Sequence, residues 1–364
     1  MEKLLTVAIP AYNAESYLAY TLDSLCGAYE KIDPFRAEGV CREIEDAEQK
    51  QLLKKLEILV IDDGSKDKTG EIADRYAEIY PETVRVIHKE NGGHGSGINC
   101  GIREARGRYF KVVDADDWVE PEAFSNLLKA LERSQDDAVV SGFYWRFDNG
   151  SGEESSFPAK AEMTEPFKGV KYGTSYSFDG IAGKVYMKMH GITWRTGILR
   201  QMPLAIDEHC YYVDAEYILY PVPWIRTVSF IPDFVYQYRI GREGQSVSPE
   251  KMVQNKKNYD RVLASLCAFY QKCRDGEIFC SEAKLHYIES GIARVAAGRV
   301  KILLSLPADR TVRNDLVQFE RKMLKKYPGI YHANRNRAVK LLRMSRYRLY
   351  RLGVWVLRRS SRKF

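Results

Sequence analysis

Three aspartates, Asp114, Asp116 and Asp117, lie within four residues directly after the apolar segment FKVV. Carboxylates this close together repel one another and raise one another's pKa unless a cation neutralises them. Mg²⁺ and Mn²⁺ take oxygen ligands, commonly one or two carboxylates together with the phosphates of a substrate. Acids before the segment PEAFSNLL could instead cap a helix, although capping explains Asp117 or Glu120 and not the whole cluster. The cluster predicts a divalent-cation site, with helix capping as the structural alternative.

Two other strand-like segments end in groups that could recognise a nucleoside. The segment LEILVIDDGS places Asp62 and Asp63 before a Gly-Ser turn, where a carboxylate could accept a hydrogen bond from a uracil N–H or a ribose hydroxyl. A helix cap would explain Ser65, but it would not explain two adjacent aspartates before the turn. The segment IPAYN supplies Pro10 and Tyr12, a rigid turn with an aromatic side chain that suits stacking on a base, although a simple strand end gives the same pattern.

The segment NGGHGSGIN, residues 91–99, is rich in glycine and lies between a predicted strand and a predicted helix. It is not the dinucleotide-binding pattern GxGxxG, because Ile98 occupies the position of the third glycine after Gly93 and Gly95. Because glycine backbone can approach a ligand closely, we expect the loop at Gly93 to lie against a bound ligand. His94 is expected to form a hydrogen bond within the loop rather than to act as a catalyst.

The elements that carry these groups indicate an α/β fold. Near-continuous apolar strands alternate with amphipathic helices through the first third of the chain, which is typical of a largely parallel sheet with helices on both faces. Ligands of such sheets bind beyond the carboxyl ends of the strands, where the acidic segments are expected to meet. The predicted strands are LTVAIP, LEILVIDDGS, VRVIHKE and RYFKVVD, and the predicted helices are AESYLAYTLDSLCGAY, KTGEIADRYAEIY, GINCGIREARG and PEAFSNLLKALERS.

The net charge of +7 is distributed unevenly along the chain. Residues 321–364 contain fifteen Lys and Arg and no Asp or Glu, which leaves 41 basic and 49 acidic residues elsewhere, a net charge of −8. In KLLRMSRYRLYRLGVWVLRR the residues Leu342, Leu349, Leu352 and Val356 recur at helical spacing. Such a helix could bind an anionic membrane surface or pack on the rest of the protein, and the two alternatives are equally favoured. No nucleic-acid partner is expected, because no recognised module accompanies the charge.

The remaining composition indicates an ordinary globular protein. Hydrophobic residues make up 45% of the chain and charged residues 29%, and no segment reaches the roughly twenty apolar residues of a membrane-spanning helix. The N-terminal MEKLLTVAIPAYN carries no signal-peptide cleavage site. Seven cysteines are scattered without a CxxC pair, which favours a reducing compartment over a zinc or disulfide framework. We expect a cytoplasmic protein, with peripheral attachment to the inner face of the cell membrane as a further hypothesis.

The combination of IPAYNAESYL, VIDDGSKDKT and NGGHGSGINCGIREARGRYFKVVDADDWVEP resembles the family 2 glycosyltransferases with a GT-A fold. The order, spacing and strand-end placement of these motifs match over roughly residues 4–135. The resemblance implies a Rossmann-like mixed, mostly parallel sheet. It also implies inverting transfer of a sugar from a nucleotide-diphosphate donor, usually a UDP-sugar, with Mn²⁺ or Mg²⁺ as the metal.

The resemblance also assigns roles to particular residues. Pro10, Tyr12 and Asp63 match the positions that hold the nucleobase. Asp114 matches the aspartate near the ribose, and Asp116 matches the aspartate that binds the metal bridging the diphosphate, with Asp114 as a second expected metal ligand. The full set of expected donor-binding residues is Pro10, Tyr12, Glu15, Asp63, Gly93, Asp114 and Gln245.

A catalytic base is expected in the segment YYVDAEY, which resembles the YYEDxEF context of the family. Asp214 matches the base, whereas Val213 replaces the preceding Glu. Inversion needs a carboxylate that takes the proton of the attacking hydroxyl, although Asp214 could also be only a helix cap. In the later segment YRIGREGQSVS, the side chains of Arg242, Gln245 and Ser246 could reach the phosphates.

The domain organisation follows from these assignments. We expect a GT-A catalytic domain over residues 1–249, with a nucleotide-binding half at about 1–135 and an acceptor half at about 136–249. Residues 250–364 are expected to form a helical region that ends in the basic tail. The charged segment EIEDAEQKQLLKKLE is expected to be a surface excursion from the catalytic domain.

The expected activity is transfer to a hydroxyl of a glycan or of a polyprenyl-linked acceptor during cell-surface polysaccharide synthesis. A sugar nucleotidyltransferase is the alternative enzyme, although IPAYNAESYL lacks the glycine-rich loop with a basic residue that such enzymes carry near the N-terminus. A sugar-nucleotide-binding protein without catalysis is the non-enzymatic alternative. Donor binding without turnover would distinguish it.

Overall fold

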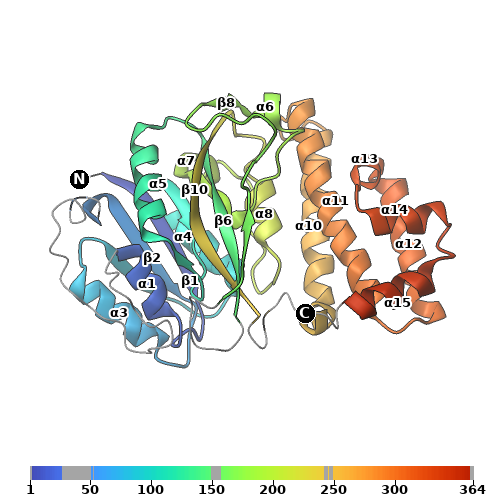
Figure 1. The fold of residues 1–364 in the computed structure, drawn as a ribbon, viewed down its shortest axis with the longest axis horizontal. Coiled ribbons are helices and arrows are strands. Elements are labelled where there is room, and N and C mark those ends of the chain that lie inside the picture. The colour runs from blue at the N-terminus through green and yellow to red at the C-terminus, as the bar shows by residue number, and fades with distance from the viewer. Residues whose placement is uncertain are drawn as a thin grey trace. The chain divides into compact units, whose positions relative to one another are not determined.

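The computed structural model describes residues 2–26, 51, 53–148, 157–241, 245 and 249–360. The chain forms two compact units (Figure 1). The first comprises Met1–His209 and Trp224–Glu243, and the second comprises Cys210–Pro223 and Gly244–Phe364. Most of the predicted surface excursion lies outside the described residues.

The first unit is built on one mixed sheet, which has 10 strands within the described residues. The strand order is β3-β2-β1-β4-β9-β6-β10-β5, with β7 beside β6 and β8 beside β10. Strands β3, β2, β1 and β4 are parallel, whereas β9 lies antiparallel between β4 and β6. The predicted α/β fold with a mostly parallel sheet is confirmed. The strands are β1 Lys3–Ala11, β2 Leu56–Asp62, β3 Val84–His88, β4 Gly107–Val112, β5 Trp118–Val119, β6 Ala138–Phe147, β7 Ala159–Glu162, β8 Tyr176–Ser177, β9 Ile192–Arg195 and β10 Thr227–Ile240.

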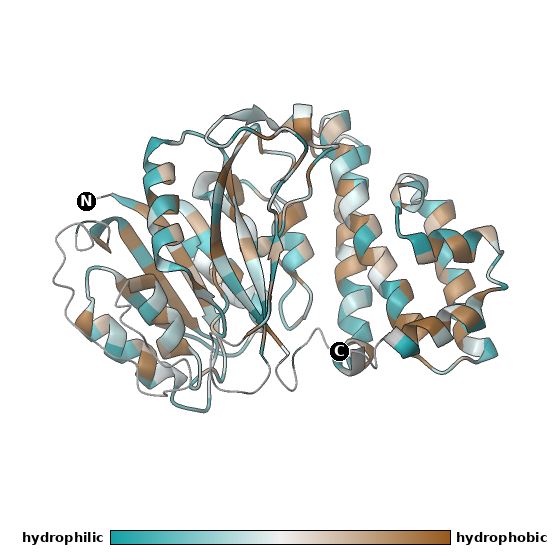
Figure 2. Ribbon diagram, in the orientation of Figure 1, coloured by the Kyte–Doolittle hydropathy of each residue, from teal (hydrophilic) through white to brown (hydrophobic). Residues whose placement is uncertain are grey.

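Helices cover both faces of the sheet, as predicted. Side chains alternate between the faces of a strand, so Val7 and Ile9 of β1 join a buried core with α1, α3 and α5. Ala8 and Pro10 point to the opposite face and contact α4. Figure 2 shows the central strands in brown, in keeping with their apolar composition. The helices of this unit are α1 Leu18–Cys26, α3 Thr69–Ile79, α4 His94–Glu104, α5 Pro121–Arg133, α6 Phe178–Ile181, the 3-10 helix Met189–Gly191 and α7 Thr196–Leu199.

The glycine-rich segment is shorter as a loop than the sequence predicts, because α4 already begins at His94. A Cβ atom added at Gly97 would lie 2.8 Å from the Cβ of Pro10, and one added at Gly101 would lie 2.8 Å from the Cβ of Ala8. These two glycines therefore allow α4 to pack closely against β1. A ligand can be approached by the loop backbone only before the helix, up to Gly93.

Strand β10 is one strand of 14 residues, where the sequence alone indicates two strand-like pieces, IRTVSFI and FVYQYR. Phe230 pairs with Val140 and Tyr236 pairs with Phe143. Between these two pairs β10 therefore advances by six residues, whereas β6 advances by three. Pro232 lies within this irregular stretch, and proline has no N–H with which to continue the ladder. The bulge therefore joins the two predicted pieces into a single bent strand.

The second unit is helical, as predicted for the chain after residue 250. Its C-terminal part has a buried cluster that includes Val300, Leu316, Val339 and Val354. None of the helices in the described residues has the length and apolar character needed to cross a membrane. The helices are α8 Asp214–Leu219, α9 Pro249–Gln254, α10 Lys256–Arg274, α11 Glu282–Ser305, α12 Arg310–Lys326, α13 Pro328–Ala333, α14 Arg337–Met344 and α15 Tyr350–Ser360.

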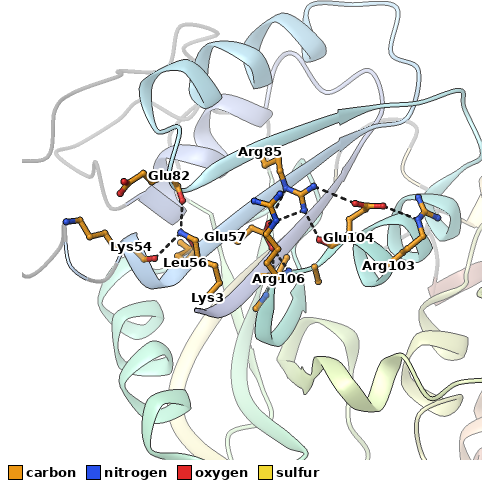
Figure 3. A network of polar contacts seen from close by, with 12 residues as sticks. Lys3, Lys54, Leu56, Glu57, Glu82, Arg85, Arg103, Glu104 and Arg106 are labelled. Atoms are coloured by element: carbon orange, nitrogen blue, oxygen red, sulfur yellow. Dashed lines mark hydrogen bonds and ion pairs between the residues drawn. The ribbon is translucent and has the colours of Figure 1, made fainter. Parts of the chain in front are cut away.

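A buried carboxylate, Glu57, joins β1, β2 and β3 where these strands begin (Figure 3). Its Oε2 accepts hydrogen bonds from Thr6 Oγ1 at 2.6 Å and from the N–H of Arg106 at 2.7 Å. Its Oε1 accepts from Arg85 Nη2 at 3.1 Å. Glu57 is 3% exposed and Thr6 is fully buried, so the Thr6 hydroxyl left without this carboxylate would have no contact with bulk water.

We expect Glu57→Ala to lower the free energy of unfolding by about 2–4 kcal/mol, because it leaves buried hydrogen-bond donors without an acceptor. Glu132→Ala is the matched control, since it removes a half-exposed ion pair with Lys55 and should cost less than about 1 kcal/mol. Urea denaturation followed by circular dichroism measures both values. Equal effects of the two substitutions would contradict the role given to Glu57.

Candidate functional site

The carboxyl ends of β1, β2 and β4 meet at one edge of the sheet. In the parallel register Ala11 lies beside Asp62, and Ala8 lies beside Val112. The loops that follow therefore bring IPAYN, DDGS and DADDW together, as the sequence predicts. Within the first unit this edge is the candidate site.

Asp114 lies at the centre of this edge and contacts the start of α4. Its Oδ1 lies 2.8 Å from His94 Nε2. Burial alone would raise the pKa of Asp114, but the attraction and hydrogen bond of His94 hold that pKa below its usual value. His94 therefore forms a hydrogen bond, but its partner belongs to the acidic cluster and not to the glycine-rich loop, where the bond is expected from the sequence.

Asp117 is fully buried and is held by β10. Its Oδ2 accepts a hydrogen bond from the Tyr236 hydroxyl at 2.6 Å, and its Oδ1 accepts from the N–H of Arg239 at 2.8 Å. Burial, followed by repulsion from Asp114, raises the pKa of Asp117 well above its usual value. Asp117 does not cap α5, because the side chain that accepts from the helix N–H of Ala123 is Glu120.

The guanidinium of Arg239 places positive charge beside the acidic cluster. Its Nε donates to the backbone carbonyl of Asp116 at 3.2 Å, and its Cζ lies 4.9 Å from the centre of the Trp118 ring. Asp116 itself is half-buried. Neither Tyr236 nor Arg239 is predicted from the sequence, because the alternation in FVYQYR indicates only a strand.

His190 joins Asp114 and Asp117 in a group that could hold a metal ion. One carboxylate oxygen of each aspartate and one ring nitrogen of His190 lie within 4.8 Å of one another. Burial lowers the pKa of His190 to about 4, although Asp114 opposes this shift, so the imidazole is neutral near pH 7 and can donate a lone pair. Asp116 is not one of these three residues.

Lys111 of β4 supports the segment that carries His190. Its Nζ donates to the backbone carbonyl of His190 at 2.7 Å, and it lies 5.5 Å from the centre of the Tyr236 ring. Burial lowers the pKa of Lys111 to about 7. No sequence pattern identifies His190 or Lys111 as site residues, since the first follows a turn-rich segment and the second interrupts an apolar strand.

Asp63, expected to contact the nucleobase, binds the glycine-rich loop. Its Oδ1 accepts from the N–H of Gly92 at 2.9 Å and from Lys89 Nζ at 2.7 Å, and its Oδ2 accepts from the N–H of Gly93 at 2.7 Å. Asp63 is buried. In this structure both Asp63 and Gly93 hold the loop in place.

Asp62 supports the same turn from the other side. Its Oδ1 accepts from the N–H of Ser65 at 3.0 Å, and its Oδ2 lies 2.9 Å from His88 Nδ1. The other ring nitrogen of His88 lies 3.0 Å from Asp74. Hydrogen bonds to Asp62 and then to Asp74 raise the pKa of His88.

The loops after β1 and β2 are joined by hydrogen bonds. The N–H of Lys66 donates to Asn13 Oδ1 at 2.8 Å, and the N–H of Lys68 donates to Glu15 Oε2 at 3.0 Å. Glu15, which is expected to bind the donor, therefore supports the loop that follows the second strand in this structure.

Pro10 and Tyr12 occupy different environments at the end of β1. Pro10 is buried beneath Gly97, whereas Tyr12 is 52% exposed. The Tyr12 ring is therefore accessible to a ligand, and Pro10 sets the position of the strand end.

A cavity of about 330 Å³ lies between the glycine-rich loop and α4. The N–H of His209 donates to the carbonyl of Gly92, and Asn99 Nδ2 donates to the carbonyl of Ile206 at 2.9 Å. These bonds hold the wall formed by residues 206–209 against α4. The other residues that line the cavity include Lys89, Asn91, Ser96, Cys100 and Arg103.

Asp214 and Gln245 belong to the second unit. Asp214 is exposed and is the first residue of α8, whose N-cap residue is Val213. Gln245 is half-buried. Arg242 and Ser246 lie outside the described residues.

The sheet order and the acidic strand ends define a GT-A-type fold, the architecture of many nucleotide-sugar transferases. The crystal structure of S. aureus TarS residues 1–349 in complex with UDP-GlcNAc has the same fold, with a TM-score of 0.62 and 17% sequence identity. The match covers 99% of this chain and 90% of the TarS chain.

Residues 6–183 match the family described as Glycosyl transferase family 2. The chain is 33% identical over 174 residues to EpsJ of Bacillus subtilis, described as an uncharacterized glycosyltransferase, covering 46% of this chain and 44% of EpsJ. It is 31% identical over 153 residues to the glycosyltransferase GlyG of Streptococcus pneumoniae, covering 42% of each. The chain therefore spans less than half of the length of either relative.

We expect the pKa of His88 to lie above its usual value of 6.5, because two carboxylates accept from its ring. A pKa raised by folding stabilises the fold below the unfolded pKa, and this contribution is lost as pH rises through the folded pKa. The free energy of unfolding should therefore fall as pH rises above about 6.5 and through the raised pKa of His88, and this fall should be smaller in His88→Gln.

An NMR titration of His88 in the wild type and in Asp74→Asn measures the pKa directly. The substitution should lower the value by removing one of the two negative charges beside the ring. A wild-type pKa at or below the usual value would show that the two hydrogen bonds do not stabilise the protonated form of the His88 ring.

Proposed function

We propose that this protein is an inverting, metal-dependent glycosyltransferase. It transfers a sugar from a nucleotide diphosphate, most simply a UDP-sugar, to a hydroxyl of a glycan or a lipid-linked acceptor. The observation that carries the proposal is the group formed by Asp114, Asp117 and His190 at the carboxyl edge of the sheet. The match of residues 6–183 to the glycosyl transferase family 2 supports the same reaction class.

The donor's nucleoside would occupy the edge beside Tyr12. The exposed Tyr12 ring offers a stacking surface for the base, and the loop after β2 offers carboxylates and backbone groups for hydrogen bonds. For Asp63 to bind a base, it would have to exchange its bond with Lys89, which can then turn toward the phosphates. The UDP-GlcNAc of the TarS complex supports a uridine donor.

The residues present fit a divalent cation. Two carboxylates and a neutral imidazole are a donor set that Mn²⁺ accepts, and Asp114 is already kept ionised by His94. We propose Asp114 and Asp116 as metal ligands. Asp116 is not one of the three grouped residues, and its place as a ligand rests on the resemblance of DADDW to the family motif; His190 and Asp117, which lie within 4.8 Å of Asp114, are the further candidate donors. When bound, the cation would offset the negative charge of the leaving diphosphate.

The chemical step needs a base for the acceptor. We propose that Asp214 takes the proton of the acceptor hydroxyl as its oxygen attacks the anomeric carbon from the face opposite the diphosphate. The bond from the anomeric carbon to the diphosphate oxygen then breaks, and the configuration inverts. The exposure of Asp214 at the start of α8 supports this role, since an acceptor must reach it. Gln245 is proposed as a phosphate contact.

The acceptor and location are proposed from the family and from the charge of the chain. A membrane-bound lipid-linked acceptor would be used at the inner face of the cell membrane, in the assembly of surface polysaccharides. The described relatives are themselves named as glycosyltransferases.

We expect Asp116→Ala to lower Mn²⁺-dependent release of UDP from the preferred UDP-sugar by at least about 100-fold, because a ligand of the charge-neutralising cation is lost. A panel of nucleotide sugars, screened by thermal stabilisation with Mn²⁺, first identifies that donor. Asp233→Ala is the matched control, since this acid of β10 binds Asn126 and not the site. Unchanged UDP release in Asp116→Ala would overturn the metal assignment.

We expect Asp214→Asn to leave the Kd for UDP within about twofold and to lower kcat for transfer by about 10²–10⁴-fold, because only the proton acceptor is removed. Calorimetry measures the Kd, and a coupled UDP assay measures kcat. Asp315→Asn changes another exposed acid, on α12, and should alter neither value. Comparable transfer rates in Asp214→Asn and wild type would remove Asp214 as the base.

A further inference from the structure

The last two helices carry apolar side chains on two faces. Val339 and Leu342 of α14 are buried in the core of the second unit, and so are Tyr350 and Val354 of α15. A second set of large apolar residues points outward, with Met344 80% exposed. The exposed set, together called the α14–α15 surface, is Leu341, Met344, Leu349, Leu352, Trp355 and Val356.

The spacing of the exposed residues shows that they form a stripe on α15. Leu352, Trp355 and Val356 lie three and four residues apart, which places them on one side of a helix. Each of the three is more than half exposed. The inward residues of α15 are the ones that pack in the core. Core packing therefore does not explain this second stripe.

The charge around the surface has one sign. Residues 321–364 contain no Asp or Glu, and Arg343, the inward-facing arginine, is neutralised by Glu320 at 2.5 Å. The exposed Arg346, Arg348 and Arg351 have no acidic partner within ion-pair distance among the described residues. The guanidinium of Arg359 lies 5.1 Å from the centre of the Trp355 ring, so cation and aromatic ring share one side of α15.

This combination favours one kind of partner. A second copy would bring like charges together, because a two-fold interface places the same patch on both sides. Nucleic acid would match the charge but would leave the Leu, Met and Val side chains in water. Of these three partners, an anionic lipid surface matches both properties, since its headgroups attract arginine and its acyl region accepts the apolar stripe.

We infer that the α14–α15 surface docks the protein on an anionic lipid bilayer, with Leu352, Trp355 and Val356 inserted at the headgroup–acyl boundary. The helices lie on the membrane and do not span it. This inference goes beyond the proposed reaction and does not depend on it, because docking requires neither a donor nor an acceptor. Its failure would therefore leave the proposed transfer untouched.

Flotation of the full-length protein with vesicles tests the inference. We expect binding to vesicles of phosphatidylcholine with phosphatidylglycerol, at least tenfold weaker binding to phosphatidylcholine alone, and a clear decrease when salt is raised. The triple variant Leu352→Gln, Trp355→Gln, Val356→Gln should bind anionic vesicles at least tenfold more weakly. Arg348→Gln with Arg351→Gln should weaken binding and reduce its salt dependence.

Two matched variants control for general effects. Phe279→Gln removes a side chain that is 86% exposed in the loop before α11, and Lys301→Gln removes an exposed charge on that helix. Neither should alter vesicle binding. All substituted positions are exposed, so unfolding temperatures should stay close to the wild-type value. If the triple variant fails to fold, the arginine variant and the wild-type dependence on lipid charge still decide the outcome.

Other results would overturn the inference. Equal binding to neutral and anionic vesicles would remove the electrostatic argument, and binding that survives the triple variant would remove the surface. If ultracentrifugation shows wild-type oligomers that the triple variant abolishes, the occupant is a second copy. If an oligonucleotide binds more tightly than anionic vesicles and displaces them, the occupant is nucleic acid.

Discussion

The constraint on which the site depends is the burial of a carboxyl group beside other carboxyl groups. Asp117 has almost no contact with water, and it lies next to Asp114. A buried acid without partners would cost several kcal/mol or lose its charge. Two hydrogen bonds from β10 offset this cost, because the Tyr236 hydroxyl and the backbone N–H of Arg239 both donate to Asp117. The acidic turn after β4 is thereby fixed to a strand that lies more than a hundred residues later in the chain.

Much of the fold follows from local sequence patterns. Apolar strands and amphipathic helices alternate clearly up to Arg133, and each predicted strand of that region forms where expected. The later strands are harder to predict because their partners are distant. Strand β9 is only ITWR, yet it lies between β4 and β6. Four residues carry too little periodicity to indicate an antiparallel strand inside a parallel sheet.

The candidate site divides in the same way. Its acids are visible in the sequence because clustered carboxylates at strand ends have few structural uses. The groups that set their ionisation are not visible, since His190 is one histidine in a turn-rich segment and Lys111 is one lysine in an apolar strand. Their roles arise from tertiary proximity. Asp63 shows the complementary case, since the residue is found from its motif while its bonds to the glycine-rich loop are not.

The bulge in β10 gives the sheet a register that depends on the number of residues in the strand. Side chains on a strand alternate between faces, so adding or removing one residue beyond Pro232 exchanges the faces of every residue that follows. Tyr236 and Arg239 lie in that last part of the strand. A change of length there, with no change of composition, would turn the hydroxyl and the guanidinium away from the acids. Evolution of this site is therefore expected to accept substitutions in β10 more readily than insertions or deletions.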